Sequence, residues 1–384
     1  MNSQRKKFEL SRKVAYLNCA NMSPLMKKVA NAGKRGIARK FKPYQLAGED
    51  YFRDADTSRM LFAQLINCPE PQRIAIVGSA AYGIAAAAKN IHLSNQDNVV
   101  VLGDQFPSNY YVWQQKCSDT GAKLHIVESP KTLDRRGEKW NYDILNAINS
   151  HTKVVAMGQV HWMDGTLFDL VKIRNRCDDV GAALIIDGTQ SIGAYPFDLQ
   201  QIRPDALIVP AYKWLMGPYS IGLAYYGSMF DNGQPLEYPW VTAKDSDKFT
   251  VDISYGQGFR PGAGRYDMGE MSNFILQPML IEALKQVNSW TTHFIQTHCH
   301  EITHSAIHTL REMGMYIEDE DSRGHHLFGI KYPDGTLSKL QKSLQANKVM
   351  VSYRGEYLRV ATHVYNDIRD INRLVRAFKE VYCK

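Results

Sequence analysis

Between residues 74 and 226, seven short apolar runs alternate with stretches long enough for helices. Each run is continuously apolar, which is typical of strands buried on both faces of a parallel sheet. The intervening segments, such as 82–91 and 170–180, are long enough for crossover helices. The pattern predicts an α/β domain with a mostly parallel sheet between two layers of helices. The expected strands are 74–77, 99–102, 124–127, 154–157, 184–186, 206–209 and 221–226.

The remainder of the chain predicts a second, smaller α+β unit. Residues 228–270 are rich in Gly, Pro, Tyr and Trp, which is typical of irregular structure. The alternation of helical and strand patterns after them is typical of a separate, mixed layer. The expected elements are a long helical stretch over roughly 274–313, a strand at 326–331, a helix at 337–346, strands at 349–353 and 357–360, and a last helix from about 367.

The composition is that of a soluble globular protein. Of the 384 residues, 44% are hydrophobic and 22% charged, and no apolar run approaches the roughly 18 residues of a membrane span. The first residues are charged and have no apolar core, so no secretory signal is expected. Six cysteines without any C-x-x-C pair indicate free thiols. We therefore expect a cytoplasmic protein with no membrane partner.

The net charge of +7 is concentrated near the N-terminus. Residues 1–42 hold twelve Lys or Arg and one acid, Glu9. A helix is expected there, with Leu25, Val29, Ile37 and Phe41 as its apolar positions. We interpret its basic side as a solvated face or one near an anionic ligand. No nucleic-acid partner is expected, because the sequence contains no nucleic-acid-binding module.

Residues that follow the expected strands suggest one chemistry. Ser79 and Ala80 open a helix after the first strand, Asp187 follows the fifth, and Lys213 follows the sixth. Ligands of such sheets bind outside the carboxyl ends of the strands. An amine that forms a Schiff base, a carboxylate that keeps a ring nitrogen protonated and a helix N-terminus for a phosphate are what pyridoxal phosphate requires.

Longer motifs carry a resemblance to a known family. The motifs are YLNCANMSPL at 16–25, DQFPSN at 104–109, IIDGTQSIGAYPFDL at 185–199, PAYKWLMGPYSIGLAYY at 210–226, RYDMGEMSN at 265–273 and YLRVATHVYN at 357–366. With them, the chain resembles the class V aminotransferase family of fold-type I pyridoxal-phosphate enzymes, which includes cysteine desulfurases, kynureninases and isopenicillin N epimerase-like proteins. The resemblance implies an N-terminal segment 1–25 that packs with the small domain, a large cofactor-binding domain 26–270, a small domain 271–384 and a homodimer.

The resemblance also implies a role for individual residues. Lys213 forms the Schiff base and moves the substrate α-proton, and Asp187 pairs with the pyridine nitrogen. Arg359 binds the substrate α-carboxylate through a bidentate pair. The other implied cofactor contacts are Gln190 to the phenolic oxygen, Phe106 against the ring, Ser79, Ala80 and Tyr212 to the phosphate, and Trp240 from the neighbouring subunit.

Three departures from the family pattern stand out. Residues 320–358 contain no cysteine, so the persulfide chemistry of a cysteine desulfurase is not expected. Pro210 stands where a phosphate-binding Ser is common. Glu270 stands where a neighbouring subunit usually sends Thr or Asn toward the phosphate. A carboxylate there is unfavourable, so we expect Glu270 to pair with an arginine such as Arg265.

The sequence therefore predicts a pyridoxal-phosphate-dependent enzyme that acts on a small amino acid or related amine, with an aminotransferase as the first interpretation. An epimerase or a carbon–sulfur or β-lyase is the alternative, and a pyridoxal-binding protein without chemistry is a further one. A more remote alternative is a zinc hydrolase, because His300-Glu301-Ile302-Thr303-His304 matches H-E-x-x-H on an expected helix. We interpret that helix as solvated or as an interface, and no metal is expected.

Overall fold

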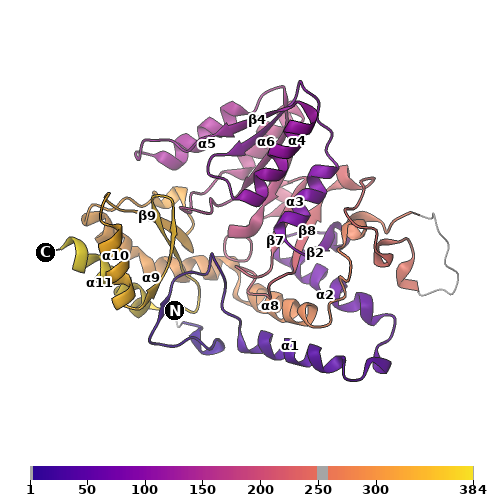
Figure 1. The fold of residues 1–384 in the computed structure, drawn as a ribbon, viewed down its shortest axis with the longest axis horizontal. Helices are drawn as coiled ribbons and strands as arrows, with labels where there is room; N and C mark the ends of the chain where they lie inside the picture. The colour runs from indigo at the N-terminus through magenta and orange to yellow at the C-terminus, as the bar shows by residue number, and fades with distance from the viewer. Residues whose placement is uncertain (1–2, 249–257, 384) are drawn as a thin grey trace.

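A computed structural model describes residues 3–248 and 258–383 (Figure 1). Its largest sheet has seven strands in the order β2-β8-β7-β6-β5-β3-β4. Strand β8 runs antiparallel to both neighbours, and the other pairs are parallel. All seven strands were predicted to within two residues at each end. Their bounds are β2 Ile74–Val77, β3 Asn98–Leu102, β4 Lys123–Val127, β5 Thr152–Gly158, β6 Ala183–Asp187, β7 Ala206–Pro210 and β8 Gly222–Tyr226.

Helices cover both faces of this sheet, as predicted. Alternate strand residues enter opposite cores: Ile74 and Ile76 pack on one side, and Ala75 and Val77 on the other. The first core includes side chains of α2, α5, α6 and α8, and the second includes those of α3 and α4. The helices are α1 Lys27–Arg39, α2 Asp50–Leu65, α3 Ala80–Lys89, α4 Tyr111–Thr120, α5 Arg136–Ala147, α6 Leu170–Val180, α7 Leu199–Ile202 and α8 Leu276–Trp290.

The basic helix α1 packs against α8 through small residues. A Cβ at Gly36 would lie 2.3 Å from the Phe274 carbonyl oxygen, and one at Gly33 would lie 2.6 Å from Met279 Sδ. The glycines therefore let the two helices approach closely. Of the apolar positions predicted for this helix, Val29 is buried, whereas Ile37 is 49% exposed. The packing face is thus made by Val29 and small residues, and Ile37 lies outside it.

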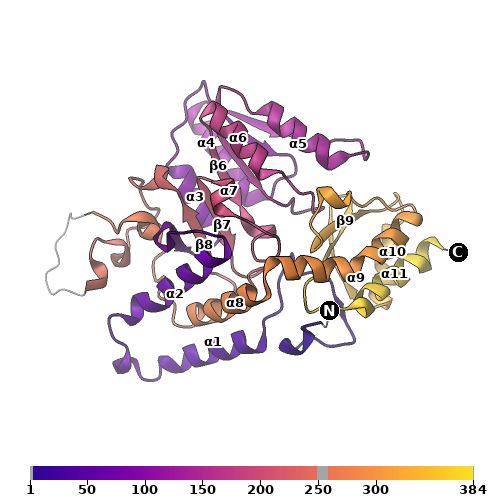
Figure 2. The ribbon, with the colours of Figure 1, turned by 180° about the vertical axis from the view of Figure 1, so that it is seen from behind.

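The long helical stretch predicted over 274–313 consists of two helices. Helix α8 ends before Thr291, whose φ is +62°, and a separate helix α9 (Thr292–Glu312) begins after it. The Thr291 hydroxyl accepts a hydrogen bond from the Phe294 amide at 3.2 Å and so caps α9. Figure 2 shows α9 extending from the end of α8 toward the C-terminal helices.

The C-terminal part is the predicted α+β unit. An antiparallel sheet in the order β11-β12-β9 packs with α9 and two further helices around a separate apolar core. The single strand expected at 349–353 is two strands, because the chain turns at Val351 between two different sheets. The elements are β9 Leu327–Lys331, α10 Leu337–Ala346, β10 Val349–Met350, β11 Ser352–Arg354, β12 Tyr357–Ala361 and α11 Ile368–Tyr382.

The N-terminal segment contacts the C-terminal unit. Strand β1 (Ala15–Tyr16) pairs in parallel with β10, and the buried Arg5 guanidinium lies 2.8 Å from an Asp370 carboxylate oxygen on α11. The predicted division into 1–25, 26–270 and 271–384 stays a prediction. Among the described residues, no helix is both long and apolar enough to cross a membrane.

Candidate active site

A cavity of about 290 Å³ lies at the carboxyl ends of the large sheet. It is bounded by the start of α3, the loop after β3 and the segment that joins β7 to β8. Five residues singled out from the sequence line it: Ser79, Ala80, Phe106, Tyr212 and Lys213. A larger cavity of about 830 Å³ beside α6 contains none of the predicted site residues. The smaller cavity is therefore the candidate active site, because the reactive groups meet there.

Lys213 is a buried amine with only 5% of its surface exposed. Burial and the nearby Arg359 charge lower the pKa of Lys213 to about 7, although Asp187 acts in the opposite direction. The Lys213 Nζ lies 5.6 Å from the centroid of the Phe106 ring and 5.5 Å from that of Tyr212. A lysine with such a pKa is neutral in a large fraction of molecules at neutral pH, so it can act as a nucleophile or a base.

Asp187 is the last residue of β6 and is also buried. One of its carboxylate oxygens accepts a hydrogen bond from the Thr189 amide at 3.0 Å, which caps a short 3-10 turn. Burial raises the pKa of Asp187 above its ordinary value, although the hydrogen bonds from Thr189 and the charge of Lys213 oppose this. A buried carboxylate near an amine is suited to bind a protonated ring nitrogen.

Helix α3 begins at the wall of this cavity. The Ser79 hydroxyl accepts a hydrogen bond from the Tyr82 amide at 3.1 Å and caps the helix. The first amide groups of any α-helix have no acceptor within the helix, and the positive end of the helix dipole favours an anion. The side chains of Ala80 and Ala81 are small. This end of α3 therefore suits a phosphate group.

Arg359 on β12 is a buried cation, 2% exposed. Its guanidinium donates a hydrogen bond to the Trp162 carbonyl at 2.7 Å, and its Nε has no partner within the described residues. It forms no ion pair with a carboxylate in that part of the chain. Burial and the charge of Arg354 lower the pKa of Arg359 to about 9. Because an unpaired buried charge is costly, this site favours an incoming anion.

Four predicted site residues are absent from the lining of this cavity: Asp187, Arg359, Gln190 and Trp240. The Gln190 side chain accepts from the Trp214 indole at 3.0 Å and donates to the Ala20 carbonyl at 3.2 Å. Trp240 is 52% exposed and packs edge-on against the rings of Tyr51 and Phe52. The predicted cofactor contacts of Gln190 and Trp240 stay predictions, since Trp240 was expected to reach the site of a neighbouring subunit.

The expected Glu270–Arg265 pair is absent from the described part of the chain. Arg265 donates instead to the Gly233 carbonyl at 3.1 Å. The sequence interpretation also missed Tyr219 and Ser220, which line the cavity just before β8. They directly follow the Gly-Pro pair of the motif that contains Lys213, and this place in the motif was the signal that the sequence offered. The residues of the H-E-x-x-H sequence lie on α9, and none of them lines this cavity.

The residues present fit pyridoxal phosphate. An amine that can be neutral, a helix N-terminus and an aromatic ring surround one cavity. The buried carboxylate of Asp187 acts on the pKa of this amine, as does the buried guanidinium of Arg359, which has no carboxylate partner within the described residues. Each of these groups matches one part of the cofactor or an amino-acid carboxylate. This arrangement on a mostly parallel sheet defines the class of fold-type I pyridoxal-phosphate enzymes.

Comparisons with known proteins agree. The family described as Aminotransferase class-V matches residues 44–378. An uncharacterized aminotransferase of Bacillus subtilis (strain 168), YcbU, is 23% identical over 83% of this chain and 81% of its own length. A cysteine desulfurase of Enterobacter sp. (strain 638) is 23% identical over 67% of this chain and 63% of its own length.

Solved structures share the whole fold. A cysteine desulfurase from Thermococcus onnurineus NA1 has a TM-score of 0.84 at 18% identity and covers 100% of this chain and 99% of its own. A C-DES mutant with glycine covalently linked to its PLP cofactor has a TM-score of 0.85 at 16% identity, covering 98% and 99%. The chain belongs to the class V aminotransferase family. The predicted family, fold class and pyridoxal-phosphate dependence are confirmed.

Proposed function

We propose that this protein is an aminotransferase that uses pyridoxal phosphate and acts on an amino acid through Lys213. The observation that carries the proposal is Lys213 itself: a buried amine with a pKa of about 7, in a cavity that also holds the N-terminus of α3. A purely structural lysine at this depth would form an ion pair with a carboxylate, whereas Lys213 forms none within the described residues, and the charges of Arg359 and Arg354 oppose the effect of Asp187 on its pKa.

Each residue then has a defined task. When bound, pyridoxal phosphate supplies an aldehyde for an amine and a ring that accepts electrons from the substrate α-carbon. The α3 amide groups would bind the phosphate, the Phe106 ring would contact the cofactor, and Asp187 would hold a proton at the ring nitrogen. The Lys213 amine would hold the aldehyde group and would move a proton at the substrate α-carbon.

Arg359 orients the substrate. Its guanidinium is fixed by the Trp162 carbonyl and offers its remaining N–H groups to a carboxylate. A planar, bidentate pair fixes the α-carbon relative to Lys213 better than a single contact would. The 2% exposure of Arg359 means that water is largely excluded from this pair.

A second candidate is a carbon–sulfur lyase. The cystine C–S lyase C-DES in complex with its product cysteine persulfide shares this fold at a TM-score of 0.83 and 17% identity. Residues 300–382 contain no cysteine, so a reaction that needs no enzyme thiol suits this chain better than desulfuration by a loop cysteine. An epimerase requires the same residues up to removal of the α-proton and stays a third alternative.

We also propose a cytoplasmic homodimer. The six cysteines are all free, and five of them are buried, which suits a reducing compartment. Trp240 is 52% exposed although it is a large aromatic residue, which supports its contact with a second copy.

The test begins with the absorbance spectrum of the purified protein after loading with pyridoxal phosphate, for wild type and Lys213→Ala. We expect a near-visible cofactor band that the variant loses. A panel of amino acids is then supplied with and without a 2-oxo acid. An aminotransferase requires the acceptor, a lyase releases a 2-oxo acid without it, and an epimerase inverts the α-carbon. A wild type that takes up no cofactor contradicts the proposal.

A further inference from the structure

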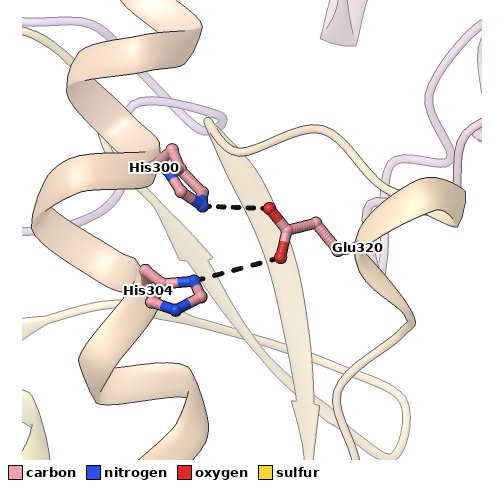
Figure 3. Close-up of side chains that lie close together, drawn as sticks. All are labelled: His300, His304 and Glu320. Carbon is pink, nitrogen blue, oxygen red and sulfur yellow. Dashed lines mark ion pairs between the residues drawn. The ribbon is translucent and has the colours of Figure 1, made fainter.

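Away from the active site, two histidines and a glutamate meet on the surface. His300 and His304 lie one turn apart on α9 and both point toward Glu320 (Figure 3). Glu320 belongs to a short 3-10 helix, Glu320–Ser322, that precedes β9. His300 Nε2 lies 2.9 Å from one Glu320 oxygen, and His304 Nδ1 lies 3.9 Å from the other. The three side chains converge on one point between two elements.

The spacing of these atoms suits a metal ion. One ligand atom from each residue lies within 4.8 Å of the others. In a tetrahedral zinc site, bonds of about 2.0–2.1 Å place neighbouring ligand atoms roughly 3.3 Å apart. The two distances to Glu320 fall on either side of that value. A rotation of exposed side chains is therefore sufficient to form the site, without movement of the backbone.

A third imidazole lies beside the cluster. The centroid of the His325 ring is 4.7 Å from that of His300, and His325 Nδ1 is buried without a hydrogen-bond partner in the described chain. The backbone amide of His325 donates to Gln296 on α9 at 2.8 Å, which fixes the residue against that helix. An imidazole nitrogen held at this place without a partner adds a donor of the kind that transition metals prefer.

We propose that His300, His304 and Glu320 bind one divalent transition-metal ion of the zinc type, with His325 at the edge of the site. Two imidazoles and a carboxylate are borderline and hard donors, which favour Zn²⁺ or Ni²⁺ over Mg²⁺ or Ca²⁺. Histidines at positions i and i+4 share one helix face, as such a site requires. The site is independent of the proposed function.

The proposed ion is a clamp, not a catalyst of hydrolysis. Glu301 follows His300 directly and so projects about 100° away around the helix. The third ligand is the carboxylate of Glu320, which lies on a segment that also contacts the large unit. Glu318 lies 3.0 Å from Arg136 on α5, and the Ser322 carbonyl accepts from the Leu167 amide at 2.8 Å. A bound ion would tie α9 to this segment.

The test is a calorimetric titration of the cofactor-loaded protein with ZnCl₂, after treatment with EDTA and removal of free cofactor. We expect one saturable site. His304→Ala and Glu320→Gln should each weaken Zn²⁺ binding at least about tenfold. His308→Ala is the matched control, because His308 lies one turn further along α9, is 72% exposed and pairs with Glu312 instead. This control should bind Zn²⁺ like the wild type.

Thermal melting gives a second measurement. Zn²⁺ should raise the melting temperature of the wild type and of His308→Ala, but not that of His304→Ala. The cluster side chains are 38–63% exposed, so the variants should melt like the wild type without metal. The proposal is overturned if the wild type shows no saturable Zn²⁺ binding, or if binding survives unchanged in both His304→Ala and Glu320→Gln. Loss of binding in His308→Ala would also overturn the assignment of ligands.

Discussion

Burial and the guanidinium of Arg359 together lower the pKa of Lys213 to about 7. Arg359, which is proposed to bind the substrate carboxylate, thus also increases the neutral fraction of Lys213, which is proposed to react. Asp187 opposes this effect, since a nearby carboxylate favours the charged amine. The reactivity of Lys213 therefore depends on the balance between an arginine from the small unit and an aspartate from the large sheet.

The rate of cofactor uptake should report this balance. Only the neutral amine attacks an aldehyde, so the rate at which cofactor-free protein takes up pyridoxal phosphate should rise with pH through about 7 and then level off. Arg359→Met removes a positive charge and should move the midpoint to higher pH. Stopped-flow absorbance across a pH series measures it. Arg369→Met, on the exposed start of α11, is the control. A wild-type midpoint near that of a free lysine would contradict the prediction.

Arg359→Met should also separate stability from activity. The variant loses the guanidinium that is proposed to bind the substrate carboxylate, so kcat/KM for the amino acid should fall by roughly 10² or more. The cofactor band should persist, because Arg359 does not line the cavity. The cofactor-free variant should melt no lower than the wild type, since a buried charge without an ion-pair partner in the described chain is removed. Steady-state kinetics and melting curves test both parts, and loss of the band would argue for a cofactor contact instead.

Two substitutions of Ser79 should separate the stability of the protein from its affinity for the cofactor. Ser79→Ala loses the helix cap and should destabilise the cofactor-free protein by about 1 kcal/mol. Ser79→Asp keeps a capping oxygen, so its stability should be close to that of the wild type, but its charge repels a phosphate. The aspartate variant should therefore bind pyridoxal phosphate far more weakly than the alanine variant. Equal cofactor affinities in equilibrium dialysis would mean that the phosphate binds elsewhere.

Arg136 should be a major determinant of stability. It lies 2.7 Å from Asp164 and 3.0 Å from Glu318, and all three side chains are buried. Arg136→Met leaves two buried carboxylates without their cation and should cost about 3–5 kcal/mol at pH 7 in urea unfolding.

The same variant should have a distinct pH dependence. Although burial favours the protonated form, His161 and Arg136 hold the pKa of Asp164 below its ordinary value. The resulting stability is present above the ordinary aspartate pKa and is lost as the pH falls through the native one. The loss in the free energy of unfolding that Arg136→Met causes should thus be smaller in acid than at pH 7. Arg135→Met removes an exposed ion pair with Glu138 and should have the same free energy of unfolding as the wild type, both at pH 7 and in acid.

The strands, and the motif residues that follow them, could be found in the sequence because buried parallel strands are continuously apolar and the motif residues come directly after them. The break at Thr291 could not, since apolar positions continue through it. The two helices share one core around the break, and beyond it α8 packs on the large sheet whereas α9 packs in the C-terminal unit. The exposure of Ile37 was missed for a similar reason: the close approach of α8 selects Gly33 and Gly36. The meeting of Glu320 with His300 depends on tertiary folding and leaves no local pattern.

The pairing of β1 with β10 has a consequence for synthesis on the ribosome. Ala15 is made before its partner Val349, which follows roughly 330 residues later. At about 5–20 residues per second, that interval lasts roughly 20–70 s. Throughout it, strand β1 has an unpaired edge and the apolar Leu17 has no core to enter. This strand and Leu17 therefore need protection from other chains until Val349 has been made.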